Sequence, residues 1–428
     1  MIQELSATIP DGLLQQVERY AELISSHGLN VQVGQLVQVS GELYHRAFIN
    51  KIVEQLYARG AGFVHVDFSD PLLQRMRIIR SKPEYLSVTP DFYSAKFSEL
   101  VEKGSANLKV LGPEFPEYLT DLEPTAVNEV RKASYRAAKR FYNEGIEKSR
   151  VHWCVVAAAT PRWAQRIFPG LDPAQAELRL WEEICKICRV DRPDFMERWR
   201  EHNDLLTSRA AALTALQIRA LHFSGPGTDL RVALSPRAIF RGGAETTSSG
   251  ESFEPNIPTE ECFTTPDCRL TQGTVRATRP FLVNGTLIKG LSLSFKNGEI
   301  DAFSCDEGGA AFEAYLSSDA GAKRLGEVAL VGVDSPVFQS GLVFEEILFD
   351  ENAACHIAIG SAYRSCLRGG AELSDAEAAE IGCNASSVHT DIMISSEEVD
   401  VSAELASGEQ LSLLRRGEWV GDLSVRRV

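Results

Sequence analysis

The chain has 428 residues, enough for two or three domains with a large apolar core that needs no cross-links. It carries 44 Lys and Arg against 59 Asp and Glu, and the formal net charge of −15 argues against nucleic acid and anionic membranes as partners. We expect a soluble, cytoplasmic protein, because the N-terminus lacks a basic stretch followed by an apolar run and no segment reaches the roughly 18 apolar residues of a membrane span.

Helical and strand-like patterns alternate in the first half of the chain, over 10–221. A helical pattern over 11–28 precedes an apolar run at 35–41, and a second helical pattern over 42–60 precedes a run at 61–68. This alternation predicts an α/β domain with a largely parallel sheet. None of the helical patterns opens with a Gly-rich phosphate loop, so we expect no nucleotide cofactor.

The second half has a different texture. Between 224 and 258 the composition shifts to Gly, Ser, Thr and Pro, as at a domain junction or a site-forming loop. Beyond it, period-two alternation and Asn-Gly turns at 284–285 and 297–298 predict hairpins. We therefore expect an α+β chain overall, with an N-terminal α/β domain over 1–222 and a β-rich C-terminal catalytic domain over 223–428.

Nine cysteines without a repeated framework are typical of reduced intracellular thiols. The close pair Cys185 and Cys188 lies in a helical pattern, where this spacing places both on one face. A zinc or redox site would require a second pair or a preceding strand. We interpret both thiols as small buried apolar side chains.

Histidines and carboxylates come together in the β-rich half. His389 and Asp391 project from the same face of a predicted strand, which places a nitrogen and an oxygen donor side by side, as suits a divalent metal. Asp350 and Glu351 form a short acidic turn between two apolar runs that read as strands, and the second of these runs carries His356. Charges there are costly unless they are paired or bound to metal.

Three further carboxylates lie near strand-like runs. Glu327 opens an apolar run, and the neighbours Glu260 and Glu261 follow a Pro-bearing extended stretch. Each candidate has a simpler alternative: a lone Glu is more often solvated, a lone His more often hydrogen-bonded in a core, and a surface His–Asp pair contributes ~0–1 kcal/mol. Spacing alone is weak evidence, since the chain has no compact H-E-x-x-H motif.

Four segments, in order and with similar spacing, resemble the successive signatures of the thermophilic-type metalloaminopeptidases, the family that includes aminopeptidase T, aminopeptidase S and PepS. They are NIPTEECFTTPD, GEVALVGVDSP, LFDENAACHIAIGSAY and NASSVHTDIMI. The resemblance continues into the first half through SSHGLNVQVGQLVQVSG and ATPRWAQRIFP, so it spans nearly the whole chain.

The resemblance implies a set of metal ligands: Glu261, Glu327, Glu351, His356, His389 and Asp391. It also implies that Tyr363 hydrogen-bonds the substrate or the developing oxyanion. Glu260 is the candidate for passing a proton to the leaving amine, with an outward-facing strand residue as the alternative. The choice of Glu261 over Glu260 as ligand rests on the flanking Phe263 and Thr264, and the reverse assignment stays open. Cys355, beside the expected ligand His356, is a potential competitor for soft metals.

The same resemblance implies a two-domain subunit in a homodimer that encloses the active site. Each subunit would hold two divalent ions, Zn, Co, Mn or Mg, which activate a water to hydrolyse the N-terminal bond of peptides with a free N-terminus. Two other functions remain possible at this point. One is metal-dependent hydrolysis of a different amide, and the other is a non-catalytic, oligomeric metal-binding scaffold.

Overall fold

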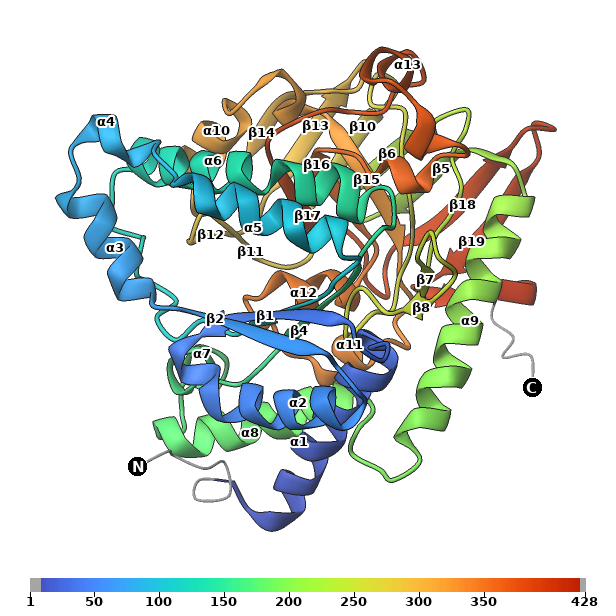
Figure 1. The fold of residues 1–428 in the computed structure, drawn as a ribbon. Coiled ribbons are helices and arrows are strands. Elements are labelled where there is room, and N and C mark those ends of the chain that lie inside the picture. The colour runs from blue at the N-terminus through green and yellow to red at the C-terminus, as the bar shows by residue number, and fades with distance from the viewer. Residues whose placement is uncertain (1–8, 424–428) are drawn as a thin grey trace. The chain divides into compact units, whose positions relative to one another are not determined.

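The computed structural model describes residues 9–423. The chain divides into two compact units, shown with their element labels in Figure 1. The first unit comprises the residues up to Arg200 together with Ala244–Pro258, and the second comprises Glu201–Gly243 together with the chain from Thr259 onward. The domain boundary expected between residues 222 and 223 falls inside strand β5, within the second unit.

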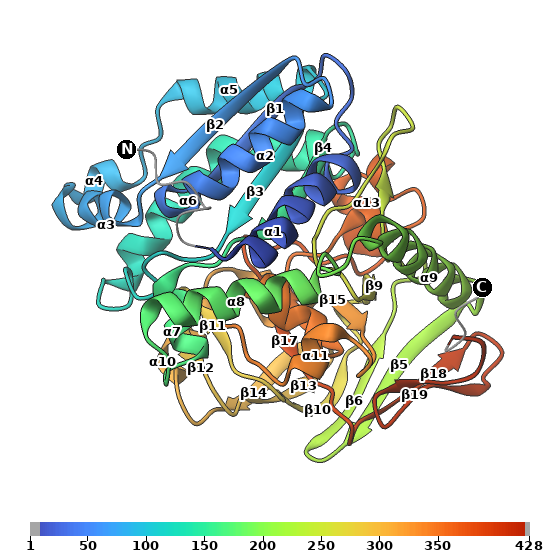
Figure 2. The ribbon, with the colours of Figure 1, turned by 90° about the horizontal axis from the view of Figure 1, so that it is seen from below.

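A four-stranded parallel sheet with the order β2-β1-β3-β4 lies at the centre of the first unit, which confirms the predicted α/β organisation. Figures 1 and 2 show α5 and α6 over one face of this sheet and α1 and α2 over the other. The strands are β1 (Leu36–Glu42), β2 (Phe63–Ser69), β3 (Ala106–Leu111) and β4 (His152–Ala157), with the short pair β7 (Glu245–Thr246) and β8 (Ser252–Phe253). The helices are α1 (Asp11–Leu23), α2 (Arg46–Ala58), α3 (Pro71–Arg80), α4 (Pro83–Leu86), α5 (Asp91–Glu102), α6 (Pro124–Arg140), α7 (Pro161–Ile167) and α8 (Pro173–Ile187), and α9 (Phe195–Ala215) leads into the second unit.

Helix α8 illustrates how local sequence sets an element. The Asp172 carboxylate accepts the backbone N–H groups of residues 174 and 175, and Pro173 occupies the first position, where its missing N–H costs nothing. The apolar face of this helix is buried. Cys185 and Cys188 are fully buried at its end, and burial raises the pKa of Cys185 well above its usual value.

The second unit contains two large antiparallel sheets and one two-stranded sheet, β11-β12. The larger has the order β14-β13-β10-β6-β5-β18-β19-β20, and the smaller has the order β17-β16-β15-β9. The strands are β5 (Ile218–Gly225), β6 (Thr228–Ala233), β9 (Cys262–Thr264), β10 (Gln272–Arg276), β11 (Phe281–Val283), β12 (Thr286–Ile288), β13 (Ser292–Lys296), β14 (Glu299–Ser304), β15 (Leu325–Leu330), β16 (His356–Gly360), β17 (His389–Met393), β18 (Asp400–Leu405), β19 (Gln410–Arg415) and β20 (Glu418–Trp419). The helices are α10 (Gly309–Leu316), α11 (Pro336–Ser340), α12 (Ile347–Asp350) and α13 (Asp375–Glu380).

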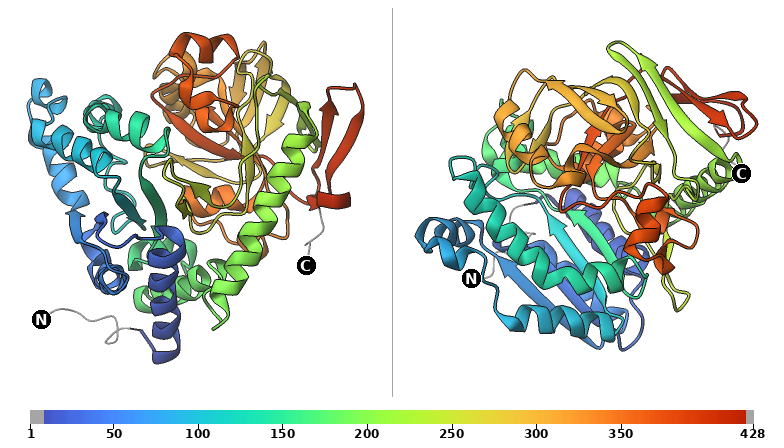
Figure 3. Two further views of the ribbon diagram at one scale, coloured as in Figure 1. Left: turned by 45° about the vertical axis from the view of Figure 1, so that its right-hand side comes forward. Right: turned by 90° about the horizontal axis from the view of Figure 1, so that it is seen from above.

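One apolar core joins both sheets of the second unit to α9. Leu206 and Leu213 of α9 pack in the same cluster as Phe223 of β5 and Val401 of β18. Figure 3 shows α9 beside the β18–β19 pair. Apolar side chains of the smaller sheet, among them Val328 and Ile357, also pack in this core.

Both predicted Asn-Gly hairpins are present, as β11–β12 and β13–β14. Asn284 has a φ of 51° and Gly285 a φ of 81°, and the second turn has φ values of 52° at Asn297 and 78° at Gly298. Two consecutive positive φ values are what a two-residue type I′ turn requires, and Asn-Gly adopts them readily.

The expectation of a strand before the acidic turn is wrong. Residues Ile347–Asp350 form the short helix α12, followed by a 3₁₀ turn over Glu351–Ala353. Side chains of this segment satisfy nearby backbone groups: Asp350 accepts the N–H of Phe344 at 2.9 Å, and Asn352 donates to the carbonyl of Leu348 at 2.8 Å. In the part of the chain that the structure describes, no helix has both the length and the apolar character needed to cross a bilayer.

Candidate metal centre

Adjacent strands of the smaller sheet place ionisable side chains on one face. Glu327 of β15 pairs with Ala358 of β16, and Ala358 pairs with Asp391 of β17. Because directly opposed residues of antiparallel strands share a face, Glu327 and Asp391 lie on the same side with only a methyl group between them. His356 precedes Ala358 by two residues and therefore shares this face.

The last strand adds His389, which pairs with Gly360 and lies two residues from Asp391. The Nε2 atom of His389 is 3.5 Å from Oδ1 of Asp391. Gly360 has a φ of +107°, and a Cβ at this position would lie 2.0 Å from the carbonyl oxygen of Val388. Glycine is therefore required where β16 meets the start of β17.

Glu261 reaches the same cluster from the residue before β9, the strand that pairs with β15 on its other side. Its Oε2 lies 3.0 Å from Nε2 of His356, which is also 4.0 Å from Oε1 of Glu327 and 3.9 Å from Oδ1 of Asp391. The other oxygen of Glu327, Oε2, lies 3.3 Å from Nε2 of His389.

These atoms form two overlapping groups in which all ligand atoms lie within 4.8 Å of one another. One group contains Glu261, Glu327 and His356, and the other contains Glu327, His389 and Asp391. Glu327 belongs to both, with one oxygen directed to each histidine. The structure therefore brings five of the six expected ligands together around a shared carboxylate.

Burial makes this concentration of charge costly. Burial and the negative charges of Glu261 and Asp391 raise the pKa of Glu327 to about 7, although the hydrogen bond from His389 opposes the shift. Burial alone would lower the pKa of both imidazoles. The carboxylates outweigh it, with Glu261 the leading contributor at His356 and Asp391 at His389, so that both histidine pKa values rise well above the usual range.

The donor set fits divalent metal ions. Oε2 of Glu261 is buried and makes no hydrogen bond within the described residues, although it lies 3.0 Å from Nε2 of His356. Two ligand atoms bound to one cation at about 2.1 Å in tetrahedral geometry lie about 3.4 Å apart, which is close to this separation. A cation between them would satisfy the orphaned oxygen and offset the repulsion among the carboxylates.

Glu351, the sixth expected ligand, lies beside the cluster but in neither group. It is the first residue of the 3₁₀ turn after α12. Burial and the negative charges of Asp391 and Glu261 raise its pKa well above the usual value. One of its oxygens accepts a hydrogen bond from Nδ2 of Asn352 at 3.4 Å.

Of the two expected catalytic residues, Tyr363 lies beside this cluster, and Glu260 directly precedes Glu261 in the sequence. The ring centroid of Tyr363 is 5.1 Å from that of His389. Although Tyr363 is 43% exposed, desolvation on its site-facing side and the charges of Glu327 and Asp391 raise its pKa above the usual value, so its hydroxyl stays protonated and can donate. Glu260 is 7% exposed, so it is not the outward-facing, solvated residue that the sequence left as an alternative.

Cys355 does not join the ligand cluster. Its Sγ lies 3.3 Å from the carbonyl oxygen of Val331 and 3.4 Å from the backbone nitrogen of the same residue. Cys355 and His356 are consecutive in sequence at the start of β16, so their side chains leave the strand on opposite faces. Burial raises the pKa of the Cys355 thiol, which further disfavours metal binding by it.

Two residues near the cluster were missed in the sequence. Nε2 of His202, on α9, donates to the carbonyl oxygen of Thr259 at 2.7 Å and lies 3.7 Å from Oε2 of Glu260. Oδ1 of Asn352 accepts the backbone N–H of Glu260 at 2.6 Å. The one available signal was the helical spacing of four residues from His202 to the buried Leu206, which places the histidine on an inward face.

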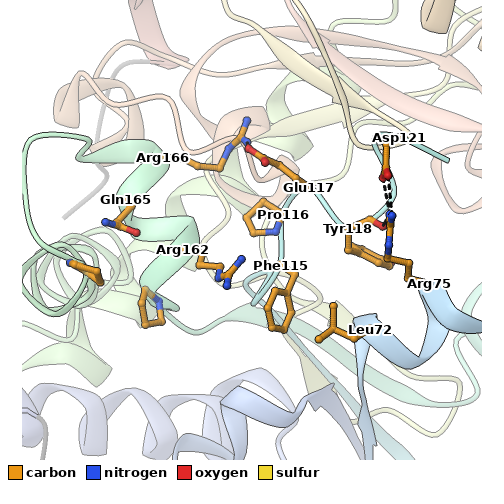
Figure 4. Close-up of a pocket in the computed structure, with 12 residues that line it drawn as sticks. Leu72, Arg75, Phe115, Pro116, Glu117, Tyr118, Asp121, Arg162, Gln165 and Arg166 are labelled. Carbon is orange, nitrogen blue, oxygen red and sulfur yellow. Dashed lines mark hydrogen bonds and ion pairs between the residues drawn. The ribbon is translucent and has the colours of Figure 1, made fainter.

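The first unit contains a separate hollow of about 830 Å³, shown in Figure 4. The segment ATPRWAQRIFP, one of those that carry the family resemblance, supplies part of its lining from α7. Both carboxylates that line the hollow are ion-paired. Nη2 of Arg75 lies 2.7 Å from Oδ2 of Asp121, and Nη1 of Arg166 lies 2.7 Å from Oε1 of Glu117. This hollow therefore does not offer the free carboxylate and imidazole groups that the smaller sheet of the second unit presents.

Carboxylate and imidazole ligands in two overlapping groups are typical of metal-dependent hydrolases. Residues 13–419 match the family described as thermophilic metalloprotease (M29). The chain is 39% identical to aminopeptidase T of Thermus thermophilus, covering 96% of this chain and 100% of that protein, and 37% identical to aminopeptidase 2 of Geobacillus stearothermophilus, covering 96% and 99%. The solved structure of wild-type AmpT from Thermus thermophilus matches with a TM-score of 0.88 at 38% identity, covering 96% of this chain and 100% of that one. The chain belongs to this family and is a metalloaminopeptidase, as its sequence segments implied.

Proposed function

We propose that the protein removes N-terminal residues from peptides with the aid of two divalent cations. One would be held by Glu261, Glu327 and His356 and the other by Glu327, His389 and Asp391, with Glu351 available beside them. The observation that carries this proposal is the position of Glu327, whose two carboxylate oxygens approach different histidines. A carboxylate placed in this way can bridge two cations.

Divalent cations at such a site supply Lewis-acid polarisation of the scissile carbonyl and lower the pKa of a water molecule. The chain's own side chains then handle protons and charge. The Glu260 carboxylate takes up the proton of the attacking water and delivers it to the leaving amine, a step that typically contributes ~10²–10⁴-fold. The protonated hydroxyl of Tyr363 donates a hydrogen bond to the oxyanion that develops on the carbonyl.

Specificity for a free N-terminus would come from direct contact of the α-amino group with the site. A carboxylate of the cluster can pair with the charged amino group, or the neutral amine can bind at a cation held there. Oxygen and nitrogen donors accept Zn, Co, Mn or Mg, so we include all four as candidate cofactors. We further infer a cytoplasmic homodimer, in line with the resemblance, and neither nucleic acid nor a membrane as a partner, in line with the net charge of −15.

Metal depletion and restoration test this proposal. The purified protein is treated with EDTA, Zn, Co, Mn or Mg is added back singly, and release of amino acids is followed from Leu-, Ala- and Arg-terminated peptides and their N-acetylated forms. We expect metal-restored cleavage of free N-termini alone. Equal cleavage of the acetylated peptides would favour hydrolysis of another amide, and metal binding without any cleavage would favour the scaffold function.

A further inference from the structure

One peptide group of the second unit is held at both ends by side chains. The carbonyl of Thr259 accepts a hydrogen bond from Nε2 of His202 at 2.7 Å, and the N–H of Glu260 donates to Oδ1 of Asn352 at 2.6 Å. The carbonyl of Thr259 and the N–H of Glu260 belong to the same peptide bond, the one between these two residues. Neither contact is part of a helix or a strand ladder.

The two side chains that hold this peptide are themselves fixed. His202 is 9% exposed on α9, and Asn352 is fully buried in the 3₁₀ turn that follows α12. Oγ of Ser335 donates to the carbonyl of Asn352 at 2.5 Å, and Nδ2 of Asn352 donates to the carbonyl of Leu348 at 2.8 Å. The two contacts therefore come from separate elements: His202 is 57 positions from Thr259, and Asn352 is 92 positions from Glu260.

Fixing both ends of a peptide group fixes the whole group, because its atoms are coplanar. The orientation of the plane before Glu260 sets the direction in which the Glu260 side chain leaves the backbone. Asn352 also contacts Oε1 of Glu351 at 3.4 Å, and Oε2 of Glu260 lies 3.7 Å from the imidazole of His202. The same two residues thus contact both this peptide group and the carboxylates of Glu351 and Glu260.

We propose that His202 and Asn352 are positioning residues that clamp the 259–260 peptide and so hold the Glu260 carboxylate in one orientation, beside His202. The inference rests on the proposed role of Glu260 as proton carrier.

The first test is kinetic. Replacing either clamp residue by leucine, in His202→Leu and Asn352→Leu, should lower kcat by about 10–100-fold, as is usual for residues that orient a metal site, while KM and metal content per chain stay within about twofold. His202→Gln keeps an N–H donor at a similar reach and should recover most of kcat. His222→Leu is the matched control in the same unit, since His222 is a half-exposed histidine paired with Asp229, and it should leave kcat unchanged.

The second test does not depend on catalysis. Amide hydrogen exchange of peptides covering 255–264 reports directly on the Glu260 N–H, which should be protected in the wild-type protein and should exchange faster in Asn352→Leu but not in the His222 control. Unchanged exchange and unchanged kcat in both leucine variants would overturn the clamp. Loss of bound metal in proportion to the loss of kcat would also overturn it, because these residues would then support the ligands rather than Glu260. If the wild-type protein cleaves no peptide, the proposed function fails, and exchange alone decides the clamp.

Discussion

Glu327 becomes significant through neighbours that are distant in sequence. In its own segment it is a single acidic residue in an apolar strand, a pattern that more often marks a solvated position. In the fold it is 4% exposed and faces His356, His389 and Asp391, which are contributed by two other strands. A buried carboxylate with a raised pKa, placed between two imidazoles, is a typical candidate for a functional site.

Substitution of single ligands should separate the two metal positions that we propose. Because Glu327 belongs to both groups, Glu327→Gln should remove activity and reduce bound metal from about two ions per chain to below one, whereas Glu261→Gln and Asp391→Asn should each retain about one. Metal content is measured by mass spectrometry after dialysis, and circular dichroism checks the fold. Glu299→Gln changes an exposed glutamate of β14 and is the control. Retention of two ions by Glu327→Gln would refute the shared role.

From the residue pattern alone, only side chains with a local partner could be placed together, whereas the full ligand set was named through the family resemblance. His389 and Asp391 share a strand face because of their spacing alone. The contact of Glu261 with His356 depends on the register of three strands, which the sequence does not show without the turn and loop geometry between them. His202 and Asn352 act on backbone atoms of Thr259 and Glu260, so no motif of side chains marks them.

At the scale of elements, the Asn-Gly turns predicted both hairpins correctly, whereas the short apolar run before the acidic turn led to a wrong prediction. The Asn-Gly turns specified both hairpins because positive φ at two consecutive residues admits few other sequences. The apolar residues before the acidic turn were expected to form a strand but form α12. A run of so few apolar residues is too short for its hydrophobic periodicity to distinguish a helix from a strand, so its packing in the fold decides its conformation. Here the Phe344 and Phe349 rings stack at 4.8 Å.

The connection after β1 provides a pH-dependent prediction. Burial raises the pKa of Glu42, the last residue of β1, from 4.5 to about 7, with Glu114 and Asp70 adding to the shift. A raised carboxyl pKa means that the folded state binds the proton more tightly, so stability falls as pH rises from about 4.5 to about 7 and stays lower above that. Glu42→Gln retains an acceptor oxygen for the N–H of Glu114, which Glu42 binds at 2.6 Å, and cannot ionise.

We therefore expect Glu42→Gln to raise the melting temperature of the protein at pH 8 and to change it little at pH 5. Thermal unfolding followed by circular dichroism at the two pH values measures the difference. The same shift at both pH values would show that the substitution acts through packing and not through the ionisation of Glu42.

At the scale of the whole molecule, the expected metal ligands belong to one unit and the parallel sheet to the other. The first has its own parallel sheet and helical layers, as the alternating pattern predicted, and all six expected ligands lie in the second. The chain passes between the units at three positions: at Glu201 and at both ends of the segment Ala244–Pro258. The Gly- and Ser-rich composition marked the segment, whereas the first crossing lies inside the continuous helix α9, where the sequence offers no break.

This division predicts that metal stabilises one unit selectively. A ligand present at about a thousand times its Kd adds ~4 kcal/mol to the state that binds it, which corresponds to about 10 °C in the melting temperature of a unit of this size. Differential scanning calorimetry with and without EDTA should therefore show two transitions, of which only that of the second unit moves. Glu42→Gln at pH 8 identifies the other transition, because Glu42 lies in the first unit. A single transition, or equal shifts of both, would mean that the units unfold together and that metal binding in the second is transmitted to the first.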